Sequence, residues 1–272
     1  MTLNFTEKKR RWPPPKPVQY ILAVTLLVIA VAILLGWLFI RFVYTAPQVE
    51  EPPQEQDTSA ISPDDLPEAG HCLIIVEDVG YERFALVTTA PKDRQVTVAA
   101  LSPDTPTDDG TLRDVLQKHG PSRAARSIAS AMDIPVVHYM SFSINDIETL
   151  FTRLGENLLF AIPEEVTYKD ENGATIHLKA EARKLTPSQV ASVFRYDQWK
   201  DPNNGDALAA DVTVAVLNAS LRPGKSLKGY FELLSNTAAT DLRIDQFNAY
   251  AIGWEYLVSV NQGAVAQRSD QR

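Results

Sequence analysis

Hydrophobic positions follow two patterns along the chain, and the first is a single unbroken run near its start. No charged residue occurs from Tyr20 to Ile40. A helix of about 20 apolar residues crosses the hydrocarbon core of a bilayer, which is roughly 30 Å thick. Lys8 to Arg11 precede the run and only Arg41 closely follows it, so the positive-inside bias places the N-terminus in the cytoplasm. The pattern predicts a single-pass type II protein of the cell membrane whose C-terminal domain is extracytoplasmic.

Two other interpretations of this run stay open. A cleavable signal peptide would have a shorter apolar region, and Pro47 would follow the best cleavage candidate, Ala46, which is unfavourable. A buried helix of a soluble domain is rarely so uniformly apolar. The membrane anchor fits the pattern better than either.

Composition changes after the run and sets the domain boundaries. Thr45 to Gly70 is rich in Pro, Glu, Gln and Asp and cannot bury enough apolar surface to order itself. Gln262 to Arg272 is polar and expected to fray. The sequence therefore predicts a cytoplasmic basic tail (1–17), a transmembrane anchor (18–44), a disordered stalk (45–70), an extracytoplasmic domain (71–257) and a polar tail (258–272).

The second pattern, between residues 71 and 257, interleaves short β-branched runs with segments of helical spacing. Predicted strands cover 73–76, 84–88, 96–101, 136–142, 158–162, 166–168 and 174–178. Predicted helices cover 111–118, 122–132, a segment ending at Leu154, 186–196, 206–221, 227–234 and 244–256. Turn residues from Pro91 to Arg94 predict a hairpin, and Thr186, Pro187 and Gln189 form a helix-start signal. The order predicts an α/β fold: a three-layer α/β/α sandwich with a mixed central sheet, preceded by one transmembrane helix.

Charge and cysteine content exclude several classes of function. The 272 residues carry a formal net charge of −8, which argues against a nucleic-acid partner. The single cysteine, Cys72, lies in an apolar run and is expected to be a small buried hydrophobe, so no disulfide can form within the chain. One cysteine and four histidines argue against a zinc cluster.

The segment from Val136 to Gly155 resembles a signature of the LytR–CpsA–Psr family of bacterial envelope proteins. The family pattern is close to Ile-Asp-His-Tyr-Val-x-Val-(Asn/Asp)-Phe-x-Gly-Phe-x-x-Leu-Val-Asp-x-Leu-Gly-Gly-Val. The positions that match it without a gap are His138, Tyr139, Ser141, Phe142, Leu150, Leu154 and Gly155. Further segments resemble other family motifs in the same order: 84–105, 111–121, 185–196 and 240–245. The resemblance spans about residues 71–257 and implies the family's fold.

The resemblance also implies an activity. Family members transfer glycopolymers from a polyprenyl pyrophosphate carrier to peptidoglycan outside the membrane, with arginines on the pyrophosphate and acidic residues near a magnesium ion. Several of those charges are missing here. Gly80-Tyr81-Glu82 replaces Arg-Ser-Asp, Pro103 stands at the arginine of Pro-Arg-Asp-Thr, and Asp197 replaces the second arginine of Arg-x-Arg. A later family motif, Asp-x-x-Arg-x-x-Arg-Gln, corresponds to the segment that starts at Asp206, and this segment contains no arginine.

The candidate site is therefore assembled from residues at motif positions and from possible substitutes. The catalytic candidates are Glu82 and Asp104, since a carboxylate can hold a metal or accept the proton of an attacking hydroxyl. The substrate-binding candidates are Arg83, Arg113 and Arg195, because guanidinium groups bind phosphates with two donors. Each has a plainer interpretation: a solvated surface charge for Glu82 and the arginines, a turn with a capping side chain for Asp104.

Two more arginines, Arg123 and Arg126, could also substitute, although exposed helix faces commonly carry such charges. No metal ligand is assigned, the cofactor is unknown, and Mg²⁺ is expected only if catalysis is retained. The expected partners are the membrane and a polyprenyl-phosphate lipid or cell-wall glycopolymer.

Three hypotheses follow. The first is an anchored LytR–CpsA–Psr-like protein of the cell envelope that has lost catalysis and binds a polyprenyl-linked glycopolymer or a partner. The second is a divergent active phosphotransferase, in which Glu82, Asp104, Arg195 and at least two of the other arginines converge in one groove. The third is an unrelated extracytoplasmic interaction domain with a chance resemblance. Topology and an apolar groove distinguish the third from the others.

Overall fold

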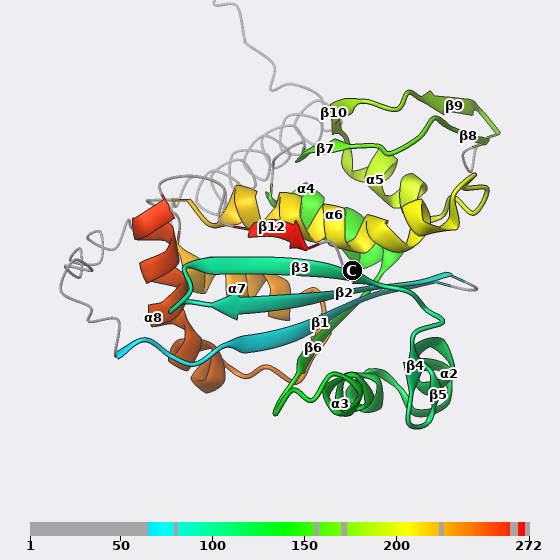
Figure 1. Ribbon diagram of the computed structural model, residues 1–272. Helices are drawn as coiled ribbons and strands as arrows, with labels where there is room; N and C mark the ends of the chain where they lie inside the picture. Colours follow the sequence, from blue (N-terminus) through cyan, green and yellow to red (C-terminus); the bar gives the residue numbers. More distant parts are fainter. Residues whose placement is uncertain are drawn as a thin grey trace, which may run out of the picture. The chain divides into compact units, whose positions relative to one another are not determined.

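A six-stranded sheet with the order β11-β6-β1-β2-β3-β12 forms the centre of the fold (Figure 1). The computed structural model describes residues 65–78, 81–154, 158–169, 173–222, 226–261 and 266–269. The predicted anchor and most of the predicted stalk lie outside these ranges. Within them, none of the helices has the length and apolarity that a membrane span requires.

The sheet contains both strand directions. β1 pairs antiparallel with β2 and parallel with β6, β2 pairs antiparallel with β3, and β3 pairs parallel with β12. The strands of this sheet are β1 (Gly70–Asp78), β2 (Tyr81–Ala90), β3 (Gln95–Leu101), β6 (His138–Ser143), β11 (Ala239–Thr240) and β12 (Ala266–Ser269). Three small pairs lie outside it: β4 (Pro106–Thr107) with β5 (Gly110–Thr111), β7 (Leu158–Ala161) with β10 (Ala182–Leu185), and β8 (Val166–Lys169) with β9 (Thr175–Leu178).

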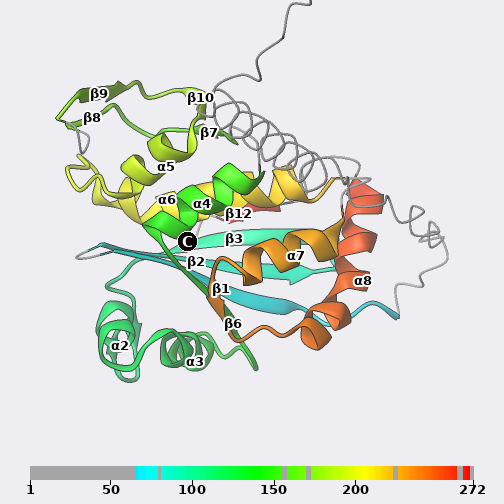
Figure 2. The same cartoon turned by 180° about the vertical axis from the view of Figure 1, so that it is seen from behind.

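Helices cover both faces of the sheet (Figures 1 and 2). The helices in the described residues are α2 (Leu112–His119), α3 (Pro121–Ala131), α4 (Ile144–Leu154), α5 (Pro187–Phe194), α6 (Pro202–Ser220), α7 (Leu227–Ser235) and α8 (Ile244–Asn261). One buried cluster joins the sheet to α2 and α3, and a larger one joins the opposite face to residues of α4 to α8. The predicted α/β fold with a mixed central sheet is confirmed.

Strand β2 shows how the sequence builds these two layers. Successive side chains of a strand point to opposite faces. Phe84 and Leu86 belong to the cluster beneath α2 and α3, whereas Ala85 and Val87 belong to the cluster on the α6 face. The same alternation applies to the polar residues at the start of the strand, and it divides them between the two faces.

The local signals in the sequence are largely found where they were expected. β2 and β3 form the predicted hairpin across Pro91 to Arg94. Thr186 accepts a hydrogen bond from the backbone N–H of Gln189, whose side chain accepts one from the backbone N–H of Thr186, so the predicted capping box starts α5. α6 begins at Pro202, earlier than residue 206, because Asp201 caps it and proline suits the first helical position.

The ends of the domain differ from the sequence-based boundaries. Leu66, in the predicted stalk, is buried, and β1 begins at Gly70. α8 continues to Asn261, past the predicted domain end, and β12 forms an edge strand within the predicted polar tail. Asn218 of α6 secures this strand, because its side-chain amide bonds both the N–H and the carbonyl of Ala266. A partner so distant in sequence leaves no local signal in the tail.

Candidate functional site

Charged side chains gather where β1 ends and β2 begins. Asp78 is the last residue of β1, and it pairs with Tyr81, the first residue of β2. Glu82 and Arg83 follow, and the alternation of the strand sends them to opposite faces of the sheet. We therefore describe two clusters: the α2-face cluster around Glu82 and the α6-face cluster around Arg83.

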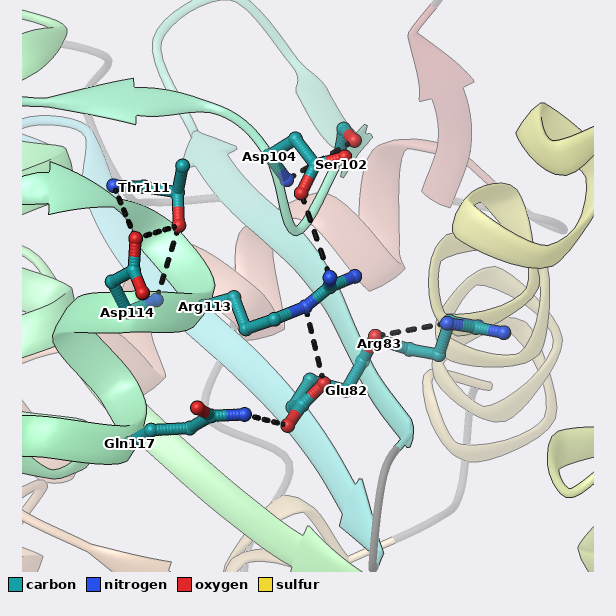
Figure 3. Close-up of polar contacts among 8 residues, drawn as sticks. All are labelled: Glu82, Arg83, Ser102, Asp104, Thr111, Arg113, Asp114 and Gln117. Atoms are coloured by element: carbon teal, nitrogen blue, oxygen red, sulfur yellow. Dashed lines mark hydrogen bonds and ion pairs between the residues drawn. The ribbon is translucent and has the colours of Figure 1, made fainter.

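The α2-face cluster consists of Glu82, Asp104, Arg113 and Gln117 (Figure 3). Arg113 Nε lies 3.4 Å from Glu82 Oε2, and Arg113 Nη1 lies 3.7 Å from Asp104 Oδ1. Gln117, one turn further along α2, donates from Nε2 to Glu82 Oε1 at 2.7 Å. Gln117 thus hydrogen-bonds one oxygen of this buried carboxylate, and Arg113 forms an ion pair with the other, although the buried Nε of Arg113 has no hydrogen-bond partner in the described residues.

The start of α2 fixes this arrangement. Thr111 and Asp114 form a capping box at the first turn. The backbone N–H of Leu112 donates to the carbonyl of Thr105, and that of Arg113 donates to the carbonyl of Pro103, both at 2.9 Å. The turn that carries Asp104 is therefore attached to the helix that carries Arg113.

On the α6 face, Arg83 is a largely buried guanidinium. Its Nη1 donates to the carbonyl of Glu82 at 3.1 Å, while its buried Nε has no hydrogen-bond partner in the described residues. The indole Nε1 of Trp199 is likewise buried without a partner there. A Cβ added to Gly205 of α6 would lie 3.1 Å from that Nε1 and 3.2 Å from Arg83 Nη2, so glycine allows the three to pack closely.

Burial lowers the pKa of the Arg83 guanidinium, and the carboxylate of Asp206 opposes this shift. The group nevertheless remains a cation at neutral pH, because arginine is effectively always protonated in proteins. Among the described residues, no carboxylate lies within ion-pair distance of Arg83. The Arg83 guanidinium therefore has a donor, Nε, that no group of the described residues occupies.

Arg195 occupies the C-terminal end of α5 and completes the α6-face cluster. Its Nε lies 3.4 Å from Asp78 Oδ2, and its Nη2 donates to Asn145 Oδ1 at 3.0 Å. Tyr81 donates its hydroxyl to Asp197 Oδ2 at 3.3 Å, and this carboxylate raises the pKa of the phenol. Arg195 stands at the first arginine of the family's Arg-x-Arg motif. Its guanidinium is already paired with a carboxylate of this chain.

The structure therefore divides the residues predicted for the site. It brings Glu82, Asp104 and Arg113 together, and it places Arg83 and Arg195 on the opposite face of the same strand ends. The two remaining substitutes join neither cluster: Arg123 pairs with Asp109, and Arg126 donates to the carbonyl of Ser122. The single groove required by the hypothesis of relocated arginines is not formed by these side chains.

A magnesium ion, which the family resemblance implies, does not fit the α2-face cluster as it stands. Mg²⁺ needs near-octahedral oxygen ligands at about 2.0–2.1 Å. Here the guanidinium of Arg113 lies between Glu82 and Asp104, and Gln117 bonds the other oxygen of Glu82. No group of three His, Cys, Asp or Glu side chains suited to a metal ion occurs in the described residues.

An apolar cavity of about 190 Å³ lies between the α6 face of the sheet and the helices that cover it. The lining residues from β1 are the alternate positions Gly70, Cys72, Ile74 and Val76, together with His71. On the helix side the lining includes Leu150, Phe194, Val216, Leu217, Phe231 and Trp254. The hydrophobic periodicity predicts only that these side chains lie in the core, and it contains no signal for a space between them.

One end of the cavity adjoins the α6-face cluster. Val76, which lines the cavity, pairs with Arg83 in the β1–β2 ladder, and Phe194, which also lines it, directly precedes Arg195. The lining of β1 extends from Val76 back to Gly70, a distance of roughly 20 Å at about 3.3 Å per residue. The site thus joins an elongated apolar cavity to a polar end that contains two arginines.

Solved structures with the same fold exist, although no protein-family model and no curated protein sequence matches this chain. A putative transcription regulator from Eubacterium siraeum has a TM-score of 0.65 at 17% identity, over 79% of this chain and 86% of that one. B. subtilis TagV has a TM-score of 0.59 at 13% identity, over 74% and 84% of the two chains. TagT bound to LI-WTA has a TM-score of 0.53 at 16% identity, over 78% and 80%.

TagV and TagT are LytR–CpsA–Psr proteins, so the fold that the sequence motifs implied is confirmed. The likeness shows the fold alone at these identities. It argues against the hypothesis that the motifs match by chance.

The cavity makes the thiol of Cys72 a direct probe of the site. Apolar surroundings raise its pKa to about 12. The thiolate is the reactive form, so we expect the native thiol to react with Ellman's reagent at pH 8 at least roughly a hundredfold more slowly than the unfolded one. The unfolded thiol ionises near pH 8.5. Because the folded state favours the neutral thiol, this preference stabilises the fold fully below that pH. The stabilisation is lost progressively as the pH rises from about 8.5 to about 12.

The measurement is the labelling rate in buffer and in denaturant, with Cys72→Ala as the blank. A native rate equal to the unfolded rate would show that the thiol is not held in an apolar cavity.

Proposed function

We propose that this protein is a membrane-anchored, extracytoplasmic LytR–CpsA–Psr-like protein of the bacterial cell envelope. It binds a polyprenyl-linked glycopolymer in the apolar cavity, and it has lost phosphoryl transfer. One observation carries the proposal: the apolar cavity ends beside a polar cluster in which Arg195, the arginine at the motif position, is paired with Asp78.

Lipid binding follows from the chemistry of the cavity. The lining of the cavity is apolar, so an apolar ligand that covers it removes apolar surface from water. Each Å² of apolar surface removed from water contributes about 25 cal/mol of stabilising free energy. A linear chain of isoprene units suits an elongated apolar space between a sheet and helices. The TagT structure, which contains a lipid-linked wall teichoic acid, supports the same class of ligand for a fold of this kind.

Loss of catalysis follows from the charges at the polar end. Phosphoryl transfer needs fixed cations aimed at the charge on the transferring group. Arg195 is paired with Asp78, and Arg113 is paired with Glu82 and Asp104. Removing one preorganised donor costs about 3–4 kcal/mol in a well-studied enzyme, so neutralising two arginines is expected to abolish transfer.

A divergent active phosphotransferase is the second candidate, and one observation favours it. Arg83 is a cation at the end of the cavity without a carboxylate at ion-pair distance in the described residues. It could hold one phosphate of a lipid headgroup. A single guanidinium is sufficient for binding, but it supplies only part of the charge that transfer requires.

The anchor is the part of the proposal that rests on sequence. The charge-free run from Tyr20 to Ile40 supports it. We expect the full chain to stay with the membrane fraction after carbonate washing and to need detergent for release. Release by carbonate alone would contradict the anchor.

Lipid binding can be tested on the detergent-solubilised full chain. We expect a polyprenyl-phosphate lipid to co-purify with it and to be identified by mass spectrometry. Val216→Trp fills the cavity and should lower the retained lipid at least roughly tenfold, equivalent to about 1.4 kcal/mol. Val214→Trp is the matched control, because Val214 lies on the same helix but does not line the cavity.

Equal lipid retention by the two variants, with both melting as folded proteins, would contradict binding in the cavity.

If catalysis is lost, a phosphoryl-transfer assay of this protein should detect no activity, and an active enzyme must be run beside it as a positive control. The purified protein, given a polyprenyl-pyrophosphate-linked saccharide and peptidoglycan fragments, should transfer or hydrolyse no faster than background, while TagT in the same assay sets the scale. A rate clearly above background that Arg83→Gln removes would establish the second candidate instead.

A further inference from the structure

The α2-face cluster places an arginine between two carboxylates that come from different parts of the fold. Glu82 belongs to β2 and Asp104 to the turn after β3, and Arg113 of α2 reaches both (Figure 3). The same figure shows Arg83 directed away, toward α6. A cation between two carboxylates occupies the place in which a divalent ion would otherwise balance them.

The surrounding charges make a cation necessary at this position. The side chain of Glu82 is 9% exposed, so its charge is largely removed from water. Glu77 lies directly opposite Glu82 in the β1–β2 ladder, and like charges in such pairs destabilise a sheet. Ser141 donates to Glu77 at 2.7 Å, which satisfies one oxygen but adds no positive charge. Among the described residues, Arg113 is the cation within ion-pair distance of Glu82.

The fold delivers this cation without a binding step. The backbone hydrogen bonds of residues 112 and 113 attach α2 to the turn that carries Asp104, and Gln117 attaches the next turn of α2 to Glu82. A tethered guanidinium is present at a high effective concentration, whereas a free metal ion must be recruited from solution and must shed water. The guanidinium also keeps its charge at every physiological pH.

We propose that Arg113 is a built-in counter-cation that replaces a divalent metal ion at the carboxylates of Glu82 and Asp104. The site is metal-free because its cation is part of the chain. Removing the guanidinium charge turns the same carboxylates into a site for Mg²⁺ or Mn²⁺. This inference concerns the α2 face and does not depend on lipid binding in the cavity.

The test compares divalent-ion binding by the full chain and five variants, with Mn²⁺ followed by electron paramagnetic resonance and Mg²⁺ by the shift in melting temperature. The unmodified chain and Arg113→Lys, which keeps a cation, should bind no Mn²⁺ below millimolar concentrations. Arg113→Gln should melt at a lower temperature without metal and should gain Mn²⁺ binding by at least roughly tenfold in affinity, with a rise in melting temperature on addition of Mg²⁺.

Two further variants assign the gained site. Arg113→Gln combined with Glu82→Gln should lose the gained binding, since a carboxylate ligand is gone. Arg123→Gln removes the guanidinium from another arginine–aspartate pair, that with Asp109, and should gain none.

Binding of Mn²⁺ by the unmodified chain that Glu82→Gln abolishes would overturn the proposal. So would a folded Arg113→Gln variant that gains no binding. Lipid retention is measured on the same preparations and reports only on the cavity. Failure of the counter-cation proposal can therefore be distinguished from failure of the lipid-binding proposal.

Discussion

The alternation of side chains along β2 governs the chemistry of this site. Glu82 and Arg83 are neighbours in sequence, yet a strand sends them to opposite faces of the sheet. Glu82 meets Arg113 and Gln117 of α2, while Arg83 packs against Gly205 of α6. The strand ends therefore carry two separate charge clusters with a sheet between them, and a ligand on one face meets only one of the two.

Within each cluster, the chain supplies most of the opposite charge itself. Arg195 faces Asp78 on the α6 face, and Arg113 faces two carboxylates on the α2 face. A guanidinium that is already paired offers an incoming phosphate less than a free one, because the existing partner must be displaced or repelled. The same pairs secure α5 and α2 to the sheet, so charges of this kind serve the fold.

The sequence predicted those features that depend on neighbouring residues. The β2–β3 hairpin follows from turn residues between two apolar runs, and the start of α5 follows from Thr186, Pro187 and Gln189. The family motifs correctly implied the fold. What could not be predicted depends on residues far apart: the contact of Arg113 with Glu82, and the pairing of β12 with β3 through Asn218. The cavity was also missed, because periodicity shows which side chains face inward but not whether they fill the space between layers.

The cavity keeps the apolar lining that a lipid requires, whereas the polar end has fewer unpaired cations than phosphoryl transfer requires, and this difference has a physical explanation. Binding of an apolar chain depends on buried area, which is spread over many side chains and tolerates substitutions that keep them apolar. Phosphoryl transfer depends on a few point charges held within a fraction of an ångström. Sequence change can therefore remove the second property while the first persists. The proposal of a lipid-binding protein without phosphoryl transfer rests on this difference, because the apolar cavity lined by β1 and α6 lies beside Arg195, whose guanidinium is paired with Asp78.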